Sequence, residues 1–397
     1  MAAGFLTEKP THEGHDMAQH PLFTDAWRRL RGAVLVTGTS AALLIAALPH
    51  GAAASTTDST ASRSATKASA SAGWTVKSID NMHASRDFVC WQQSAAFMAS
   101  IASAERAANA NTATVDTPYD TAANYHQCSN PKNPMAYEAA WVRALRTQGL
   151  HVWFRQNWFN WEGGYGAPKL TAATSPAIRL GTAAAVLNGS DTTSYLAMTY
   201  HFILDHPGLY ANGDILTPES EPQNGGVRQS YGACSGPCQF ADWKTFNTWL
   251  RDSMTVDAAA FAKLGLRVTV GYWGLQCSNN RYNGQDNIEA STIAQMGVYA
   301  ADCYFKDVPT LKAHLAQLHS SYNVNVVVGE FGDIWDGGAQ PSTSNLVTTV
   351  ATSAGSLGYV HGFNYWQAYG GSGGEGLVDK KTLRLNATGL AMAAIFN

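Results

Sequence analysis

Two glutamates in this sequence could act together on one substrate bond. Glu221 lies in a Ser-Glu-Pro sequence, and Pro222, which has no N–H to donate to a sheet, predicts that a strand ends there. Glu330 follows three consecutive valines, and we expect Gly329 and Gly332 to let the backbone turn tightly around it. Two carboxyl groups ~5–5.5 Å apart can cleave a glycosidic bond by double displacement, one as nucleophile and the other as acid and then base.

Glu219 is the alternative to Glu221, because both side chains point to the same face of an extended strand. The proline that follows Glu221 favours it as the residue held at the end of the strand. A proton donor at such a site needs a raised pKa, which a nearby negative charge and partial burial can supply.

The elements that must hold these glutamates alternate along the chain as short β-rich runs and longer helical stretches. We predict strands at 74–79, 112–116, 152–158, 214–218, 267–272, 298–304, 324–329 and 362–366. We predict helices at 87–108, 135–148, 192–204, 241–264, 308–320 and 344–357, and we expect three of them to end at Gly149, Gly265 and Gly358. Eight such units in ~325 residues predict an α/β fold, a single (β/α)8 TIM barrel.

In a barrel of this kind the working residues follow the carboxyl ends of the strands. Glu221 and Glu330 follow strands four and seven, whose ends face each other across the barrel mouth. Other candidate substrate-binding residues lie at or near strand ends: Asp116, Arg155, Trp158, Ser220, Trp273, Tyr304, Trp335 and Trp366. Among them, Trp366 is placed to cover the apolar face of a sugar, and Tyr304 could donate a hydrogen bond to the nucleophile.

Three polar residues near these strand ends each have more than one interpretation. Arg155 could orient a carboxylate or a sugar hydroxyl, or it could form an ordinary salt bridge inside the barrel. Asp116 could line the site or cap a turn. Asn364 could contact sugar hydroxyls.

These motifs resemble the cellulase-like retaining glycoside hydrolases of clan A. The resemblance rests on the Ser-Glu-Pro of strand four, the Gly-Glu-Phe-Gly of strand seven and the Tyr-Trp-Gln of strand eight, short motifs in a topology that spans the mature domain. It implies that Glu221 is the acid/base, Glu330 the nucleophile and Trp366 the platform under the reacting sugar. Ser220 departs from the pattern, because the clan usually has Asn there, whose amide contacts the sugar 2-hydroxyl.

The composition is that of a globular protein with an uncharged partner. The 397 residues are 45% hydrophobic and 14% charged, which excludes a disordered chain. With 26 Lys and Arg against 29 Asp and Glu, the net charge of −3 indicates no nucleic-acid partner. Low charge and many aromatic residues favour a carbohydrate substrate. We expect a monomer, and no motif indicates a nucleotide or redox cofactor.

The first 72 residues differ in composition from the rest of the chain. Within residues 1–54, three arginines precede an apolar run and a group of small residues, which predicts an export signal. The alternative is a retained membrane anchor, since the run approaches the ~17 residues that a span needs. Residues 55–72 are almost entirely Ser, Thr and Ala and predict a flexible linker, so the catalytic domain is expected at 73–397. We expect a secreted protein with no membrane contact after cleavage of the signal.

The cysteines predict disulfides rather than a metal site. An even number in an exported chain favours disulfides, and pairing of neighbouring loops would give Cys90–Cys128, Cys234–Cys238 and Cys277–Cys303. A zinc site is the alternative, but the CxxxC spacing lacks paired histidines. Asp333 and Asp336 could bind Ca²⁺, although no regular ligand pattern is present. We therefore expect no metal.

Together these patterns predict a secreted retaining glycoside hydrolase that acts on a polysaccharide or oligosaccharide, with a β-glycan as the expected class. The alternative is a non-catalytic carbohydrate-binding protein on the same barrel, which the presence of both Glu221 and Glu330 disfavours. Metal-assisted hydrolysis would need His and Asp ligands at the strand ends, where this chain has Glu and Trp.

Overall fold

The structure is a computed structural model that describes residues 74–81, 85, 92–117, 133–156, 180–219, 227, 240–271, 275–276, 281–282, 285–303, 308–332, 343–369 and 376–397. All of these residues belong to one compact unit, Ala65–Asn397. The predicted export signal at 1–54 and linker at 55–72 lie outside the described residues and stay predictions.

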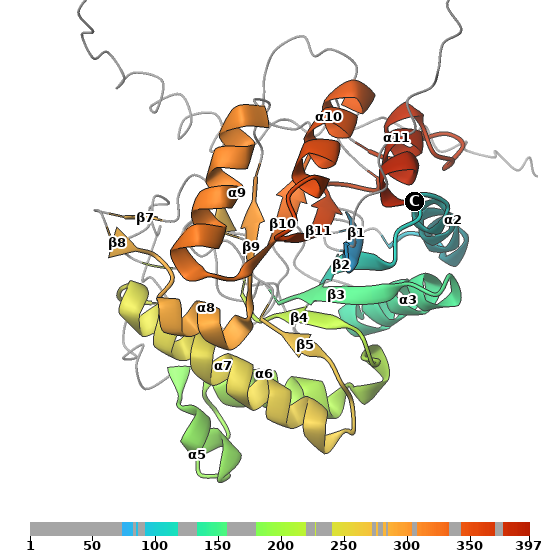
Figure 1. Cartoon of the computed structure of the whole chain (residues 1–397). Coiled ribbons are helices and arrows are strands. Elements are labelled where there is room, and N and C mark those ends of the chain that lie inside the picture. The colour runs from blue at the N-terminus through green and yellow to red at the C-terminus, as the bar shows by residue number, and fades with distance from the viewer. Residues whose placement is uncertain are drawn as a thin grey trace, which may run out of the picture. The chain divides into compact units, whose positions relative to one another are not determined.

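Among the described residues, nine parallel strands form one curved sheet (Figure 1). In chain order they are β1 (Val76–Asp80), β2 (Thr112–Asp116), β3 (His151–Arg155), β4 (Ile215–Thr217), β5 (Thr269–Val270), β6 (Leu275–Gln276), β9 (Val298–Asp302), β10 (Asn325–Phe331) and β11 (Val360–Tyr365). Their order in the sheet is β5-β4-β3-β2-β1-β11-β10-β9-β6, which leaves β5 and β6 at the two edges.

These two edge strands are pieces of one barrel strand. β5 pairs with β4, β6 pairs with β9, and only residues 271–274 separate β5 from β6. Five Cα steps span at most about 18 Å, so the two edges of the sheet must lie near each other. The sheet therefore curves into a cylinder, and the predicted (β/α)8 barrel is confirmed, with its fifth strand in two segments.

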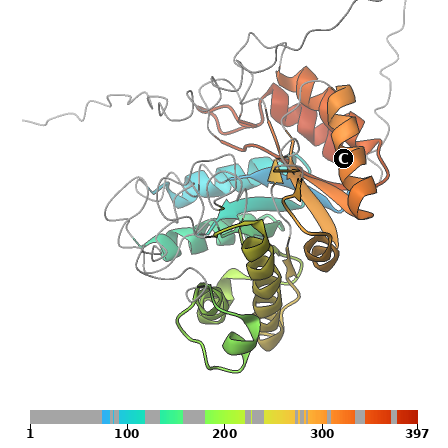
Figure 2. The ribbon, with the colours of Figure 1, turned by 90° about the vertical axis from the view of Figure 1, so that its left-hand side faces the viewer.

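Helices alternate with the strands: α2 (Ala95–Ala107), α3 (Pro134–Thr147), α5 (Ala183–Leu187), α6 (Tyr195–Asp205), α7 (Trp243–Lys263), α8 (Ala290–Met296), α9 (Val308–Tyr322), α10 (Thr343–Gly355) and α11 (Ala387–Phe396). A short 3-10 helix, η2 (Pro207–Leu209), precedes β4, and an antiparallel pair, β7 (Arg281–Tyr282) and β8 (Gln285–Asp286), precedes α8. In both ribbon views α7 lies on one side of the strands, and α9 and α10 lie on the opposite side (Figures 1 and 2).

Short polar side chains determine where several of these helices begin. Ser94, Ser194 and Asp242 each accept a hydrogen bond from the backbone N–H three residues later, at the first turns of α2, α6 and α7. Such a cap satisfies one of the donors that a helix start leaves without a partner. The cap at Ser94 explains why α2 begins at Ala95 and not, as predicted, at Asp87.

Glycines mark two of the three predicted helix ends. Gly149 and Gly265 follow α3 and α7 in the left-handed conformation, with φ of +73° and +71°. The predicted end of α10 at Gly358 is wrong, because the helix stops at Gly355 and Gly358 is not left-handed.

The inside of the barrel is apolar at its base and polar toward the carboxyl ends of the strands. The base is an apolar cluster of Val76, Trp153, Ile215, Val298, Ala300 and Val327. Above it, Thr114 Oγ1 lies 3.2 Å from Ser78 Oγ and donates to Asn364 Oδ1 at 3.2 Å. A larger apolar cluster occupies the space between the strands and the helices. The polar layer inside the barrel therefore indicates the end at which a site is built.

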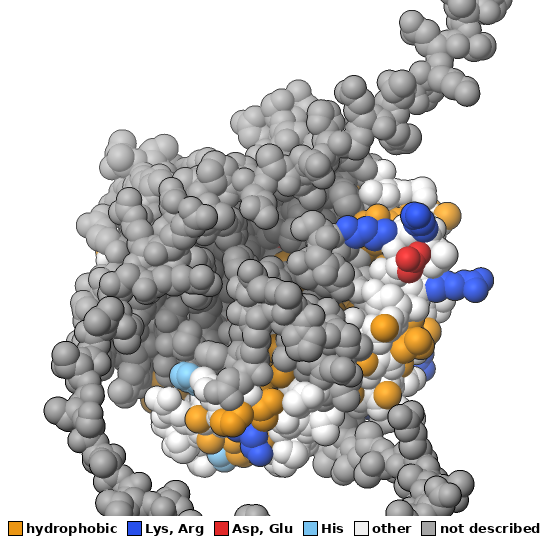
Figure 3. All heavy atoms as spheres, turned by 90° about the horizontal axis from the view of Figure 1, so that it is seen from above, with side chains coloured by type: hydrophobic (Ala, Val, Ile, Leu, Met, Phe, Trp, Pro, Cys, Tyr) orange, Lys and Arg blue, Asp and Glu red, His pale blue; other side chains and the backbone are white. Residues whose placement is uncertain are grey.

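The described part of the surface carries few features that stand out. Seen from above, it shows a few Lys and Arg side chains among apolar ones (Figure 3). Leu187 and Leu390 are large apolar side chains exposed singly on α5 and α11. None of the described helices combines the length and the apolar character needed to cross a bilayer.

Candidate active site

In the part of the chain that the structure describes, five ionisable residues lie at the carboxyl ends of the barrel strands, and all five are buried. They are Asp80 on β1, Asp116 on β2, Arg155 on β3, Asp302 on β9 and Glu330 on β10. Four are the last residues of their strands, and Glu330 is the last but one. Because the strands are parallel and form a barrel, these ends share one rim, which is where barrel enzymes carry their active sites.

Arg155 lies between two carboxylates of this rim. Its Nη1 donates to Glu330 Oε1 and lies 3.7 Å from Asp80 Oδ2. The side chains of Asp80, Arg155 and Glu330 are 0%, 4% and 7% exposed. Charges removed from water need opposite charges and hydrogen bonds, and the guanidinium supplies both. The contact also fixes the orientation of the Glu330 carboxylate.

A bulge in β10 turns Glu330 into the barrel. Val328 pairs with Ala301 and Glu330 pairs with Asp302, so β10 advances by two residues while β9 advances by one. If β10 alternated regularly here, Glu330 would face the same side as Val328, which lies in the outer apolar cluster. The bulge places the carboxylate on the inner face, where it meets Arg155.

Gly329 and Gly332 support this geometry by being small and not, as predicted, by forming a tight turn. Neither has a left-handed backbone, and Glu330 lies within β10 rather than after it. A Cβ on Gly329 would lie 2.7 Å from Asp302 Oδ1, and a Cβ on Gly332 would lie 2.2 Å from the carbonyl oxygen of Trp366. The missing side chains therefore let Asp302 and Trp366 lie close against β10.

Trp366 directly follows β11 and is 6% exposed. Its backbone N–H donates to the carbonyl of Phe331 at 2.9 Å, and the peptide bond between Trp366 and Gln367 is cis. The hydrogen bond to Phe331 holds Trp366 beside the end of the strand that carries Glu330. Its predicted role as a sugar platform stays a prediction.

The remaining predicted site residues differ in how much the structure says of them. Asp116 is buried at the end of β2, and its backbone N–H donates to Ser85 Oγ at 3.2 Å. Glu219 is buried two residues after β4. The others lie outside the described residues, and their roles stay predictions: Trp158, Ser220, Glu221, Trp273, Tyr304 and Trp335.

Asp80 and Asp302 are not among the site residues expected from the sequence. The first strand was expected to end at Ile79 and the sixth at Tyr304, whereas the strands end at Asp80 and Asp302. Asp302 has the parity of Val298, a residue of the inner apolar cluster. Counting in steps of two from an inward apolar residue to the strand end could have identified it.

Two buried glutamates lie behind the rim on helices. Glu105 of α2 accepts a hydrogen bond from Asn81 Nδ2 at 2.6 Å, and Glu138 of α3 lies near Asp116. Burial raises the pKa of both carboxyls well above the ordinary value, and the charges of Asp80 and Asp116 raise it further. These carboxyls therefore keep their protons to higher pH than a glutamate in water.

Cys303 follows β9 directly after Asp302 and is fully buried. It is disulfide-bonded, and its partner lies outside the described residues. The predicted pairing with Cys277 therefore stays a prediction. In the described part of the chain, no group of three or more His, Cys, Asp or Glu side chains is arranged to hold a metal ion.

Comparisons with known proteins find similarity in structure only. No family model and no curated protein matches the sequence. A GH5_18 protein from Bifidobacterium longum subsp. infantis is 12% identical, with a TM-score of 0.57 over 81% of this chain and 78% of that chain. A GH5_18 protein from Streptomyces cattleya, solved in complex with GlcNAc, is 13% identical, with a TM-score of 0.56 over 81% of this chain and 79% of that chain.

The endo-beta-1,4-mannanase from Thermotoga petrophila is 11% identical, with a TM-score of 0.50 over 82% of this chain and 76% of that chain. At such low sequence identities, structural similarity indicates a shared fold and does not indicate a shared activity. The chain described here therefore shares its fold with these three proteins.

Proposed function

We propose that the chain is a secreted retaining glycoside hydrolase that cleaves a β-glycan by double displacement. Glu330 is the nucleophile and Glu221 the acid/base, with Glu219 as the alternative acid/base. The observation that carries the proposal is the placement of Glu330. It lies at the carboxyl end of barrel strand seven, faces inward because of the bulge, and is held by Arg155.

The reaction has two steps. In the first, a Glu330 carboxylate oxygen attacks the anomeric carbon while the acid/base donates its proton to the departing glycosidic oxygen. In the second, the same acid/base takes a proton from water, the water oxygen attacks the anomeric carbon, and the bond to Glu330 breaks. Arg155 holds the attacking carboxylate in place, and Trp366 provides an apolar surface beside it.

The proteins of similar fold support a β-glycan as the substrate class. One of them is an endo-beta-1,4-mannanase, and another binds the sugar GlcNAc. The low charge of this chain, 14% Asp, Glu, Lys and Arg, is compatible with a neutral polysaccharide.

The first test is the release of reducing ends by the full-length chain from a panel of β-glucans, β-mannans, xylans and galactans. We expect turnover of at least one glycan and its loss by roughly 10⁴-fold or more in Glu330→Gln, because the nucleophile is gone. Glu289→Gln, which changes a partly exposed glutamate on the outer surface, is the matched control and should retain activity. A Glu330→Gln variant as active as the wild type on every glycan would end the enzymatic proposal.

The second test asks which glutamate donates the proton and whether the configuration is retained. Proton NMR of the first product should show the anomer of the substrate, as double displacement requires. The acid variant, Glu221→Gln or Glu219→Gln, should lose about 10²–10⁴-fold on ordinary glycans. It should lose far less on aryl glycosides, whose leaving groups need no proton.

A further inference from the structure

Asn364 of β11 lies opposite the bulge that aims Glu330. Val328 of β10 pairs with Phe363, and Phe331 pairs with Tyr365. Two residues of β10, Gly329 and Glu330, therefore lie opposite a single residue of β11, Asn364. A bulge places an extra residue in the strand and disrupts the regular ladder of hydrogen bonds around it.

The side chain of Asn364 makes three hydrogen bonds and is almost fully buried. Its Nδ2 donates to the carbonyl oxygen of Gly329 at 2.8 Å and to Asp80 Oδ2 at 3.2 Å. Its Oδ1 accepts from Thr114 Oγ1 at 3.2 Å. A carbonyl and a carboxylate can only accept, so these neighbours define which end of the amide carries the nitrogen.

From these contacts we propose that Asn364 is a positioning residue that maintains the bulge and thereby aims Glu330 at the substrate. A buried carbonyl without a donor costs about 1–3 kcal/mol, so the amide stabilises the Gly329 carbonyl where it is. The same amide binds Asp80, which lies 3.7 Å from the guanidinium that holds Glu330. Asn364 thus acts on Glu330 through the backbone and through Arg155, and the inference rests on the proposed role of Glu330 as nucleophile.

This role differs from the sequence-based expectation that Asn364 contacts sugar hydroxyls. Only 1% of its surface is exposed, and its amide already has three partners within the barrel. Its effect on catalysis is therefore expected in kcat rather than in KM.

The test compares Asn364→Ala and Asn364→Asp with the wild type on the glycan that the wild type cleaves. A displacement of a reacting group by about 1 Å can lower the rate by about 10²-fold, and we expect a loss of that order in kcat with KM within about threefold. In Asn364→Asp the introduced carboxyl can donate to the Gly329 carbonyl only when protonated. The kcat of Asn364→Asp relative to that of Asn364→Ala should therefore rise as the pH falls.

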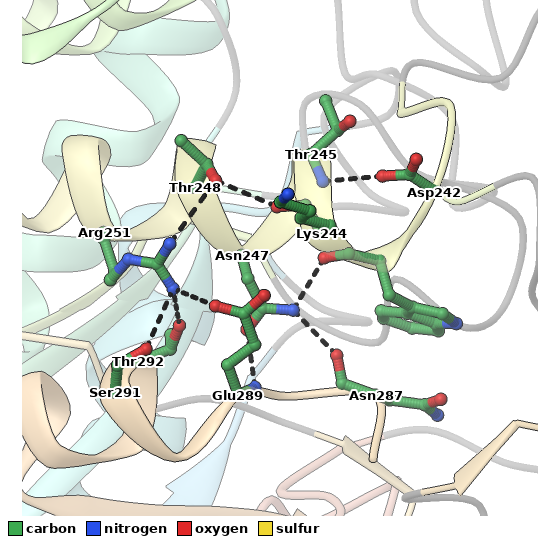
Figure 4. Close-up of polar contacts among 11 residues, drawn as sticks. Asp242, Lys244, Thr245, Asn247, Thr248, Arg251, Asn287, Glu289, Ser291 and Thr292 are labelled. Carbon is green, nitrogen blue, oxygen red and sulfur yellow. Dashed lines mark hydrogen bonds and ion pairs between the residues drawn. The ribbon is translucent and has the colours of Figure 1, made fainter. Parts of the chain in front are cut away.

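Asn247 of α7 provides the matched control for loss of stability alone (Figure 4). It is equally buried, its Nδ2 donates to the carbonyls of Trp243 and Asn287 at 2.7 and 2.8 Å, and its Oδ1 accepts from the Glu289 N–H at 2.8 Å. Asn247→Ala should lower the Tm by an amount comparable to Asn364→Ala and leave kcat within about threefold. Equal losses of kcat in the two variants, measured on folded protein, would overturn the proposal.

A crystal structure of Asn364→Ala separates this inference from the proposed function. We expect the register of β10 to change and Glu330 to lose its contact with Arg155. If the wild type cleaves no glycan, the proposed function fails while this structural outcome still decides whether Asn364 aims Glu330. An unchanged bulge and an intact Glu330–Arg155 contact in the variant would refute the inference whatever the activity.

Discussion

Two regions of this protein use the same kinds of side chain in different surroundings. At the barrel rim, Arg155 contacts Glu330 while Asn364 holds the neighbouring backbone. Between α7 and α8, Arg251 Nη1 contacts Glu289 Oε2 at 2.6 Å while Asn247 holds the neighbouring backbone (Figure 4). We call the second region the α7–α8 clamp.

Exposure separates the two regions. The Arg251 and Glu289 side chains of the clamp are 27% and 39% exposed, against 4% and 7% for Arg155 and Glu330. A partly exposed ion pair stabilises a protein by about 0–1 kcal/mol. When one partner is removed, water screens the charge of the other. A buried ion pair often stabilises a protein no more than apolar side chains of the same size would. Removing one partner is nevertheless costly, because the other charge stays buried without its counter-charge. The clamp can therefore be explained by its contribution to the structure, whereas the burial of the rim pair fits the catalytic role that we propose for Glu330.

The largest expected effect is the difference between Arg155→Met and Arg251→Met. Arg155→Met leaves Glu330 and Asp80 buried without their guanidinium and should lower the free energy of unfolding by about 3–5 kcal/mol. Arg251→Met should lower it by at most about 1 kcal/mol. Urea unfolding of both variants measures the difference. Similar small losses would show that the rim pair is no more costly to break than the clamp.

Asp257 extends the comparison to a buried carboxyl group whose hydrogen-bond partners are hydroxyl groups and not a guanidinium. Asp257 of α7 accepts a hydrogen bond from Ser253 Oγ at 3.0 Å. Burial raises its pKa from 3.8 to about 7, and the hydrogen bonds from Thr199 and Ser253 lower it only in part. The folded state therefore holds this proton more tightly than the unfolded state does.

Stability should fall as the pH rises between about 4 and 7, by up to about 1.4 kcal/mol for each pH unit, and level off above that range. Asp257→Asn removes this dependence. As the pH rises from about 4 to 7, the unfolding free energy of the variant should therefore increase relative to that of the wild type. Asp252→Asn, on the same helix, is the control. Parallel pH profiles for the wild type and Asp257→Asn would contradict the prediction.

The smallest of these effects comes from a single methyl group beside Glu330. Gly329→Ala places a Cβ 2.7 Å from Asp302 Oδ1 and should cost about 1–3 kcal/mol of stability and reduce kcat, because β10 must shift. Gly358→Ala adds the same methyl group in open space at a residue that is not left-handed, and should change stability by less than about 0.5 kcal/mol. Thermal unfolding and kinetics of both variants provide the comparison. A Gly329→Ala variant with wild-type kcat would show that the rim tolerates a shift of β10.

Much of the barrel could be predicted from local sequence. The alternation of β-rich and helical segments gave eight units, and one strand, Thr112–Asp116, has the predicted bounds. Among the helices that the structure describes, α5, α8 and α11 were not predicted. The first two have only 5 and 7 residues, and α11 is apolar on all sides, so none shows a clear helical period.

The site could be predicted only in part, because its geometry depends on register. Counting alternate residues from Val328 would have placed Glu330 on the outer face of β10. The extra residue that reverses this is defined by the pairing with β9 and β11, which no local pattern contains. The contact between Arg155 and Glu330, 175 positions apart in the chain, likewise depends on closure of the barrel.

The divided fifth strand has a consequence for the whole cylinder. β5 and β6 each meet their neighbour through two residues, fewer than any other pairing among the described barrel strands. The remaining strands form one continuous arc, and β5 and β6 join its two ends. Because β5 and β6 connect β4 to β9, they contribute to the distance between these two strands. In the mechanism proposed for Glu330 and Glu221, the distance between the two carboxyl groups therefore depends in part on the barrel strand that has the fewest paired residues in the described part of the chain.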